Sequence, residues 1–254
     1  MYVDINVENV SKFCNMNVVL LLTACIVPNC KEQLYISDPD ERKAQYIDAL
    51  NFYLCNTDYD IVFVENSGTD ISCFFPDFKK RIEWITYKGV ITDRSRSYAE
   101  MDIIEYAYNN SKYLKTADVI CKITGRLQLL NIVELTNYFQ ELPKNGFISS
   151  YKSINKEVSE SKYIWFSWNF LPFLIKEKEE IGWDYIFETA LSVAIQNAQK
   201  QGFKFIYPKM FPREHGIGMY KGRVYDTSDY QYIVSNIKHQ IKRVFFRIGI
   251  FPLR

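Results

Sequence analysis

The 254-residue sequence lacks the features that mark zinc proteins, secreted proteins and membrane-spanning proteins. It has only two histidines, and its six cysteines form no CxxC pair and no Cys/His group with zinc-site spacing. No secretory signal is visible, because residues 1–16 carry charged side chains and no apolar core. The longest apolar run, residues 18–27, is about ten residues long, which is too short to span a bilayer. We therefore expect a cytoplasmic protein with reduced thiols.

An excess of charge of one sign is also missing. The 31 Lys and Arg side chains nearly balance 30 Asp and Glu, and the formal net charge is +1. A general nucleic-acid-binding protein needs a basic excess, so nucleic acid is not an expected partner. The sequence is instead rich in apolar residues (48%) and in aromatic residues (16%). The apolar content is enough for the core of one large domain, and the aromatic content suits a cleft that stacks on sugars or bases, or a surface that meets a membrane.

Hydrophobic patterning predicts strands that alternate with helices. Residues 17–24 are apolar on both faces, which is typical of a central parallel strand. A helix is predicted to begin near Asp38, because Pro39 suits a first helical turn. Further strands are predicted at 60–66, 81–87, 118–123 and 163–168, further helices at 97–115, 131–142, through 176–180, at 184–201 and from 229, and a long loop at 208–226. This order predicts a nucleotide-binding α/β/α sandwich with a mostly parallel central sheet.

We expect one catalytic domain over residues 17–228, with a nucleotide-binding half (17–130) and an acceptor half (131–228). Residues 1–16 are interpreted as an N-terminal extension and residues 229–254 as a basic amphipathic tail. The tail interleaves basic and bulky apolar residues, a pattern typical of a segment that lies on an anionic membrane surface. The alternative is a terminal helix that packs on the core.

The most informative stretch is an apolar strand that runs into Thr124-Gly125-Arg126. These three residues supply a hydroxyl, an open backbone and a fixed positive charge at the carboxyl edge of a sheet, where open α/β sheets bind ligands. The pattern predicts an anion-binding cleft in which Arg126 contacts the anion. The alternative is that Arg126 pairs with a carboxylate. Lys122, inside the strand, is more simply explained by a salt bridge.

The chain resembles the bacterial capsular polysaccharide and O-antigen (lipopolysaccharide) glycosyltransferases of GT-A type. The segments that carry the resemblance are residues 18–24, 38–46, 62–67, 97–100, 122–126 and 187–188, within a span of roughly 17–226. The resemblance implies a GT-A-like fold and the transfer of a sugar from a nucleoside-diphosphate donor to a growing surface glycan. It also implies a lipid-linked acceptor and an enzyme that lies peripherally on the cytoplasmic membrane.

A set of donor-binding residues is predicted, some because the resemblance places the nucleotide at the strand ends and others because they are polar or cationic side chains in loops. They are Thr23, Ala24, Glu65, Asn66, Arg96, Thr124, Gly125, His215 and Lys221. Each has a plainer explanation. Small residues at a strand end suit packing, Glu65 and Asn66 could cap a turn, and an arginine in a loop is often solvated.

Glu188 is the candidate catalytic base. An inverting transfer needs a carboxylate that takes the proton of the acceptor hydroxyl, and the resemblance places it at the start of a helix in the second half, where Glu188 lies. Asp184, one turn earlier, is the rival. The structural explanation for both is that a negative charge is favoured near a helix N-terminus.

The chain departs from the GT-A pattern at the metal-binding motif. GT-A enzymes usually follow the fourth strand with Asp-x-Asp, and Thr124-Gly125-Arg126 stands there instead. A guanidinium can offset the charge of a diphosphate leaving group, so we expect a metal-independent enzyme. Mn²⁺ or Mg²⁺ held by carboxylates that meet only in the fold is the alternative. Residues 38–40 and 58–60 do spell Asp-x-Asp, but we expect the first at a helix start and the second ahead of a strand.

Two other functions stay open from the sequence. A nucleotidyltransferase could share a similar sheet, but it would need Mg²⁺-binding carboxylates and usually a glycine-rich signature after the first strand, where residues 23–29 offer neither. A non-catalytic nucleotide- or glycan-binding partner in a polysaccharide assembly complex is the alternative from another class.

Overall fold

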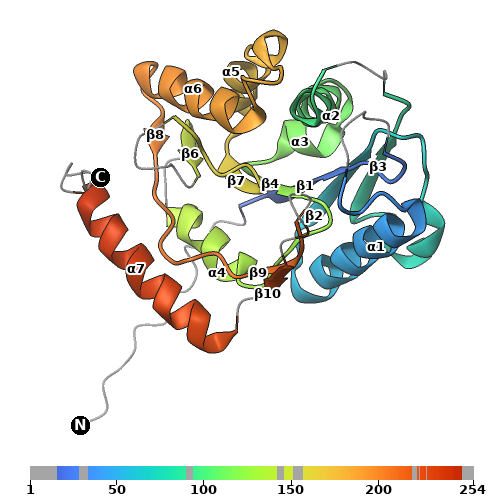
Figure 1. The fold of residues 1–254 in the computed structure, drawn as a ribbon, viewed down its shortest axis with the longest axis horizontal. Coiled ribbons are helices and arrows are strands. Elements are labelled where there is room, and N and C mark those ends of the chain that lie inside the picture. The colour runs from blue at the N-terminus through green and yellow to red at the C-terminus, as the bar shows by residue number, and fades with distance from the viewer. Residues whose placement is uncertain are drawn as a thin grey trace.

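A seven-stranded sheet crosses the middle of the molecule in the computed structural model (Figure 1). The structure describes residues 16–28, 34–89, 94–141, 146–150, 157–218, 222, 224–226 and 228–247. In spatial order the strands are β3 (Ile82–Thr86), β2 (Asp60–Glu65), β1 (Val18–Ala24), β4 (Val119–Thr124), β7 (Tyr163–Phe166), β6 (Phe147–Ser149) and β8 (Lys204–Phe205). Among these strands only β7 runs antiparallel to its neighbours. The predicted α/β architecture with a mostly parallel sheet is therefore confirmed.

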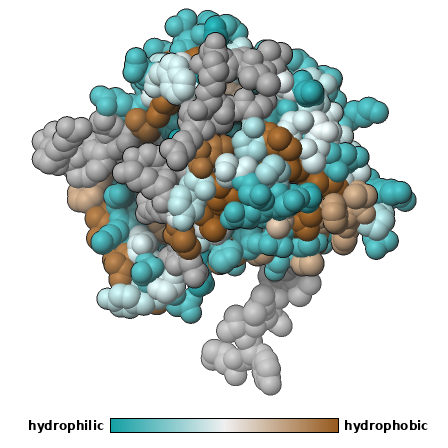
Figure 2. Space-filling model, turned by 45° about the vertical axis from the view of Figure 1, so that its right-hand side comes forward, coloured by the Kyte–Doolittle hydropathy of each residue, from teal (hydrophilic) through white to brown (hydrophobic). Residues whose placement is uncertain are grey.

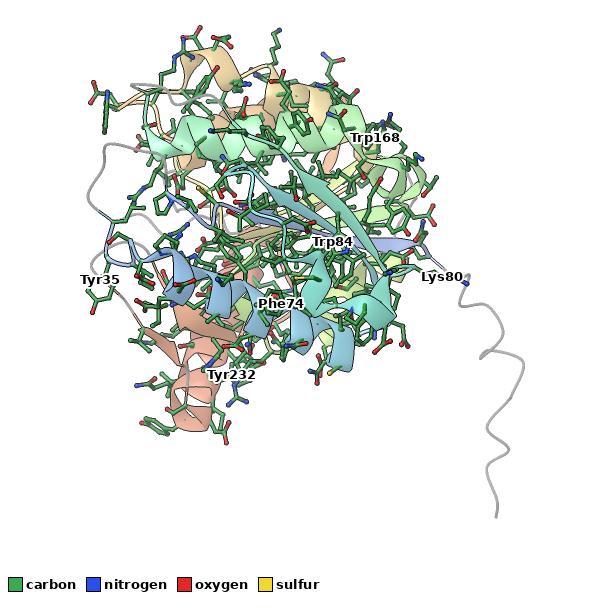
Figure 3. All side chains as sticks on the ribbon, turned by 90° about the vertical axis from the view of Figure 1, so that its right-hand side faces the viewer. Tyr35, Phe74, Lys80, Trp84, Trp168 and Tyr232 are labelled. Carbon is green, nitrogen blue, oxygen red and sulfur yellow. The ribbon has the colours of Figure 1, made fainter. Side chains whose placement is uncertain are left out.

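Helices cover both faces of this sheet. On one face lie α2 (Arg96–Asn110), α3 (Lys112–Thr116), α5 (Leu171–Ile175) and α6 (Phe187–Lys200), and on the other lie α1 (Pro39–Asn56) and α4 (Ile132–Asn137). Helix α7 (Asp229–Arg247) lies outside α4, and edge-on the sheet is seen between the α1 and α2 layers (Figure 3). Short 3₁₀ helices lie at Ser72–Phe74, Pro76–Phe78, Tyr138–Glu141, Trp168–Phe170 and Lys178–Glu180.

The two-sided cover explains why β1 is apolar throughout. Val19 and Leu21 pack in one core with the buried residues of α2 and α6, and Leu20 and Leu22 pack in a second core with those of α1 and α4. All four side chains are fully buried. A strand with helices on both sides has no solvent face, so it shows a continuous apolar run and no alternation.

The two Asp-x-Asp sequences take the structural places predicted for them. Asp38 is the N-cap of α1, its Oδ1 accepts a hydrogen bond from the Glu41 N–H (2.8 Å), and Pro39 is the first helical residue. Asp60 is the first residue of β2. Neither sequence contributes to the cavity described below.

The helix predicted over residues 97–115 is in fact two helices, α2 and α3. The break lies at Ser111, which is extended and caps α3 by accepting from the Leu114 N–H (3.0 Å). Glu83, at the edge of the sheet, accepts from the Ser111 hydroxyl (2.5 Å) and from the backbone N–H groups of Lys112 (2.8 Å) and Tyr113 (3.0 Å). A distant carboxylate thus stabilises the start of a new helix, which local periodicity cannot indicate.

The predicted loop over residues 208–226 contains a β-hairpin. Strand β9 (Glu214–Ile217) pairs with β10 (Val224–Asp226) and with β5 (Gln128–Leu129) in a second, three-stranded antiparallel sheet. These strands are two to four residues long, too short to show an alternating pattern.

The helix predicted through residues 176–180 is replaced by α5, which ends at Ile175, and a 3₁₀ turn. In the part of the chain that the structure describes, no helix is long and apolar enough to cross a membrane.

Candidate functional site

A cavity of about 290 Å³ lies at the carboxyl ends of β1, β2 and β4. Thr23 and Ala24 of β1, Asn66 just after β2 and Thr124 of β4 line it. The first turns of α2 and α6 contribute to its wall, and residues of β9 and β10 also line it. The carboxyl edge of a parallel sheet is where open α/β folds bind their ligands, because the chain turns away there and leaves a crevice.

The structure brings most of the predicted site residues to this one cavity. Seven of them line it, namely Thr23, Ala24, Asn66, Arg96, Thr124, Arg126 and Glu188. Glu65, Gly125 and His215 do not line it, and neither does Asp184, the rival base. Lys221 lies outside the described residues, as do residues 1–15 and 248–254 of the predicted extension and tail.

Arg126 is a buried cation that forms no ion pair with a carboxylate of the described residues. Its Nη1 donates to Gln45 Oε1 (2.8 Å) and to the Ile217 carbonyl oxygen (3.2 Å), and only 5% of the residue is exposed. No carboxylate oxygen of the described residues lies within 4.0 Å of its guanidinium. Burial lowers the pKa of Arg126 and the charge of Arg42 lowers it further, against the opposite effects of the Tyr46 hydroxyl and of the more distant Glu100 carboxylate. Arginine nonetheless stays protonated in proteins, so this charge calls for an anion.

Arg42 and Tyr46 of α1 form the wall next to Arg126. Arg42 is 4% exposed, and its Nε donates to the Cys25 carbonyl oxygen (2.8 Å) at the end of β1. The Tyr46 hydroxyl accepts from the Cys25 N–H (2.9 Å). Burial raises the pKa of Tyr46, against the effect of the two arginines, so its hydroxyl stays protonated at neutral pH. The loop after β1 is therefore held by α1, with two guanidinium groups close together.

A hydrogen-bond chain of side chains and one carbonyl crosses the cavity floor. Thr23 donates through Oγ1 to Glu100 Oε1 (2.8 Å), and the same oxygen forms an ion pair with Lys122 Nζ (2.5 Å). Lys122 also donates to the Ser161 carbonyl oxygen (2.8 Å), and the Ser161 hydroxyl donates to Glu188 Oε1 (2.7 Å). All five residues line the cavity. The chain connects β1, α2, β4 and α6, and the salt bridge predicted for Lys122 is confirmed.

Glu100 and Glu188 each use one carboxylate oxygen in this hydrogen-bond chain. Oε1 of Glu100 and Oε1 of Glu188 are hydrogen-bonded, whereas Oε2 of each has no protein partner among the described residues. The hydrogen bond from the Ser161 hydroxyl fixes the orientation of the Glu188 carboxyl group. A carboxylate held in this way can accept a proton from a bound hydroxyl.

Asn66 carries an unsatisfied polar atom. The residue is 2% exposed and lines the cavity, and its Oδ1 is buried without a hydrogen-bond partner in the part of the chain that the structure describes. Its backbone is fully used, since its N–H donates to the Ala24 carbonyl (3.1 Å) and its carbonyl accepts from the Gly89 N–H (2.8 Å). A buried acceptor without a donor is unfavourable, and a ligand that offers an N–H or O–H group would correct this.

Glu65 is a structural residue in this fold. Its Oε1 accepts from the N–H groups of Ile26 (2.9 Å) and Ser67 (3.0 Å) and from the Ser67 hydroxyl, and its Oε2 accepts from the Thr69 N–H (2.8 Å). Both oxygens are thus occupied and the residue is fully buried. Glu65 shapes the loops after β1 and β2, and the donor contact implied by the resemblance is not supported.

Gly125 and His215 also lie outside the cavity lining. The Gly125 N–H donates to the Thr23 carbonyl oxygen (3.0 Å), and a Cβ at this position would lie only 2.7 Å from that oxygen. Glycine is therefore required for the close approach of the turn to β1. His215 is exposed on β9, where its backbone pairs with Gln128 and Asp226. Neither position supports the predicted donor contact.

Lys162 also lines the cavity. Its Nζ donates to both oxygens of Glu214 (2.7 Å each) and lies 4.4 Å from the centroid of the Tyr225 ring. Burial lowers the pKa of Lys162, but Glu160 and Glu214 outweigh it and raise the pKa above its ordinary value. The pKa of Glu214 is also raised, because burial has a larger effect on this carboxyl group than the opposing charge of Lys162. This pair ties β9 to the segment before β7.

The net electrostatic character of the cavity is cationic. Among the described residues, five cationic side chains line it, namely Arg42, Arg96, Lys122, Arg126 and Lys162, and two carboxylates do, namely Glu100 and Glu188. Lys122 is paired with Glu100 and Lys162 with Glu214, so the three arginines carry the excess. A protein of net charge +1 thus concentrates positive charge in one concave site. Charge of one sign in a cleft with apolar walls attracts ligands of the opposite sign.

The residues that are described hold no group of three or more His, Cys, Asp or Glu arranged for a metal ion. Metal independence stays a prediction.

Arg42, Tyr46 and Glu100 were missed by sequence reasoning, whereas Arg96 was predicted. Arg42 and Tyr46 are four positions apart on α1, and Glu100 lies four positions after Arg96 on α2, so each pair shares one helix face. Each helix is the next element after a strand of the parallel sheet, α1 after β1 and α2 after β3. Polar i, i+4 pairs in the N-terminal half of such helices were the available signal. Nothing in the sequence indicated Lys162 or Tyr225.

No protein-family model matches the chain, and no curated protein matches it in sequence. Solved structures do match. A protein from Desulfovibrio desulfuricans G20 described as a nucleotide-diphospho-sugar transferase has 10% identity and a TM-score of 0.45, over 76% of this chain and 79% of its own. Mouse xyloside xylosyltransferase 1 has 10% identity and a TM-score of 0.42, over 76% and 84%.

A third similar structure is 4-diphosphocytidyl-2C-methyl-D-erythritol synthase from Anaerococcus prevotii, with 10% identity and a TM-score of 0.43, over 89% of this chain and 99% of its own. These activities are those of the named proteins. For this chain, the residues of the cavity are the basis on which we infer an activity.

Proposed function

We propose that the chain is a glycosyltransferase that moves a sugar from a nucleoside-diphosphate donor to a hydroxyl of a glycan acceptor. The observation that carries this proposal is the buried, carboxylate-free guanidinium of Arg126, which lies with Arg42 and Arg96 in one cavity at the carboxyl edge of the sheet. A diphosphate matches this environment, because guanidinium groups bind phosphate oxygens through charge-assisted, bidentate hydrogen bonds.

The donor is proposed to lie across the strand ends. Its diphosphate would contact Arg126 and Arg42, and its nucleoside would lie toward Asn66 and Thr23, where an unsatisfied buried acceptor is available for an N–H or O–H group. Ala24 and Thr124 would form the floor between them. As the glycosidic C–O bond to the diphosphate breaks, negative charge develops on the leaving oxygen. Preorganised cations stabilise that charge without reorganisation, which lowers the barrier.

Glu188 is proposed to be the general base. In an inverting transfer the acceptor oxygen bonds to the anomeric carbon, its proton passes to Glu188 Oε2, and the nucleoside diphosphate leaves with the electron pair of the broken bond. The Ser161 hydroxyl holds Glu188 Oε1 (2.7 Å) and so keeps Oε2 turned to accept the proton. Glu100 is held by Thr23 and Lys122 and would orient groups on the α2 side of the cavity.

The acceptor that we propose is a growing bacterial surface polysaccharide, such as a capsule or O-antigen chain, carried on a lipid. The support for it is the resemblance of the strand-end motifs to that group of enzymes and the character of helix α7, which is developed below. A nucleotidyltransferase or a non-catalytic binding partner would use the same anion-binding cavity in another way, and the experiment below separates these functions.

The proposal is tested by binding and then by turnover. UDP, GDP, CMP and dTDP are added separately, with and without Mn²⁺, in a thermal-shift assay, because a ligand that binds only the folded state stabilises it by mass action. One nucleoside diphosphate should stabilise the protein. Stabilisation by CMP alone would contradict a diphosphate donor, and no stabilisation by any nucleotide would contradict a nucleotide-dependent transferase.

Turnover is measured as hydrolysis or transfer of the matching nucleotide-sugar by the Glu188→Gln variant. Donor binding should persist, and turnover should fall by about 100- to 10,000-fold, the usual contribution of a general base. Asp184→Asn, which removes the rival carboxylate outside the cavity, is the matched control and should keep full activity. A Glu188→Gln variant with unchanged turnover would exclude Glu188 as the base.

A further inference from the structure

Helix α7 presents its apolar side to solvent and its polar side to the protein. Five large apolar side chains on it are between 53% and 76% exposed, namely Tyr230, Ile233, Ile237, Ile241 and Val244. Hydrophobic surface is visible at the lower left of the molecule in Figure 2, on the side where Figure 1 shows α7. A helix that packs on a core normally buries such a stripe.

The inward contacts of α7 are made by polar side chains. Asn236 Oδ1 accepts from a backbone N–H of the segment 207–211 (3.0 Å), and His239 Nε2 (2.8 Å) and Gln240 Nε2 (2.6 Å) donate to backbone carbonyls of that segment. His239 is 2% exposed, and its ring stacks on that of Tyr207 with centroids 4.8 Å apart. These contacts fix the rotation of α7 about its own axis, and its apolar side therefore faces the solvent.

The outward residues, from Tyr230 to Val244, form a straight, narrow stripe. They follow one another at intervals of three, four, four and three positions, so at 100° per residue they fall within an arc of about 80°. The stripe extends for about 21 Å along the axis. The spacing repeats after 11 residues, from Tyr230 to Ile241 and from Ile233 to Val244. A left-handed coiled-coil partner requires a 7-residue repeat, whereas a straight stripe can meet a flat surface along its whole length.

The charges near the stripe are positive. Lys238 and Lys242 are exposed on α7, and Lys209, whose backbone holds Gln240, is exposed next to it. The acidic residue of the described helix is Asp229 at its first position, and it is paired with Arg213 (2.5 Å). An apolar stripe flanked by lysines is complementary to an interface that is apolar inside and anionic outside.

We propose that α7 lies flat on an anionic lipid bilayer and inserts this stripe into the interface between headgroups and acyl chains. The helix begins three positions after Asp226, the last residue of β10, and β10 contributes Tyr225 to the cavity. A docked α7 therefore keeps the cavity close to the membrane, where a lipid-linked acceptor is available. The binding of lipid requires no donor and no catalysis, so this surface is independent of the proposed function.

The test is co-sedimentation of the full chain with vesicles of phosphatidylcholine alone and with vesicles that also contain phosphatidylglycerol. The protein should pellet with the anionic vesicles, and raised salt should weaken the binding. The double variant Ile237→Ser/Ile241→Ser should bind these vesicles with an affinity at least about tenfold lower, because two inserted side chains are lost. Its unfolding midpoint should equal that of the wild type, since both residues are already exposed.

Phe74→Ser is the matched control. Phe74 is 55% exposed on a 3₁₀ helix outside α7, so its removal changes exposed apolar area without touching the stripe. It should bind vesicles as the wild type does. Equal vesicle binding by the double variant, or no binding to anionic vesicles, would overturn the proposal. Self-association that the double variant abolishes, in the absence of lipid binding, would instead identify a second copy of the chain as the partner.

Discussion

Replacing Arg126 with methionine should separate stability from ligand binding. Methionine keeps much of the length of the side chain but removes the charge and the hydrogen bonds to Gln45 and Ile217. The loss of two hydrogen bonds costs about 1 kcal/mol each, and removing a buried charge without a carboxylate partner returns a similar or larger amount. We therefore expect the free energy of unfolding in urea to stay within about 1 kcal/mol of the wild-type value.

Binding should respond in a different way. Hydrogen bonds to charged groups contribute about 1.5–3 kcal/mol each, so the Kd of the nucleoside diphosphate selected by the thermal-shift assay should rise about 10- to 150-fold. Isothermal titration calorimetry at constant salt measures this change. For Arg126→Met we thus predict a raised Kd together with an almost unchanged free energy of unfolding.

Arg81→Met is the matched control, because Arg81 is a second partly buried arginine with a purely structural role. Its guanidinium donates to the carbonyls of Leu54 (3.0 Å), Thr57 (2.6 Å) and Tyr59 (3.0 Å), and it does not line the cavity. The variant should lose about 2–4 kcal/mol of stability and keep the wild-type Kd. If Arg126→Met behaved like this control, Arg126 would be a structural residue and the reasoning about the anion site would be refuted.

Three further predictions concern the supports of the site and of α7. Gly125→Ala places a Cβ 2.7 Å from the Thr23 carbonyl oxygen, so urea denaturation should show a loss of about 1–3 kcal/mol, and unchanged stability would show that the turn can move freely. Lys122→Met and Glu100→Gln should couple by about 1–3 kcal/mol in a double-mutant cycle, because they form a 2.5 Å ion pair, and additive losses would contradict that pairing. Burial lowers the pKa of His239 from 6.5 to about 4, so the unfolded state takes up the proton first as the pH falls. Stability should therefore fall by up to about 3 kcal/mol between pH 6.5 and pH 4, and His239→Gln should remove this part of the slope in denaturation curves measured across that range.

Features that depend on short stretches of chain could be predicted before the structure was known. The apolar run of β1 predicted a strand covered on both faces, and Asp38 with Pro39 predicted the start of α1, because capping and burial act on neighbouring residues. Thr124 and Arg126 were expected at the carboxyl edge of the sheet and Glu188 at a helix start, and all three line the cavity. Strand ends and helix starts are local events, so their side chains could be assigned to one edge of the fold.

Which distant groups meet depends on long-range packing, which short sequence patterns do not show. Glu100 and Lys122 are 22 positions apart and pair because α2 packs on β1 and β2, and β1 is the neighbour of β4 in the sheet. Glu65 instead accepts hydrogen bonds from the backbone of two loops. The hairpin that covers the cavity depends on pairing with β5, far along the chain. The orientation of α7 is set by polar contacts to the segment 207–211, although its periodicity favours the opposite face. Periodicity shows that a helix has an apolar side, but only the competition among long-range contacts determines whether that side faces the core or the solvent.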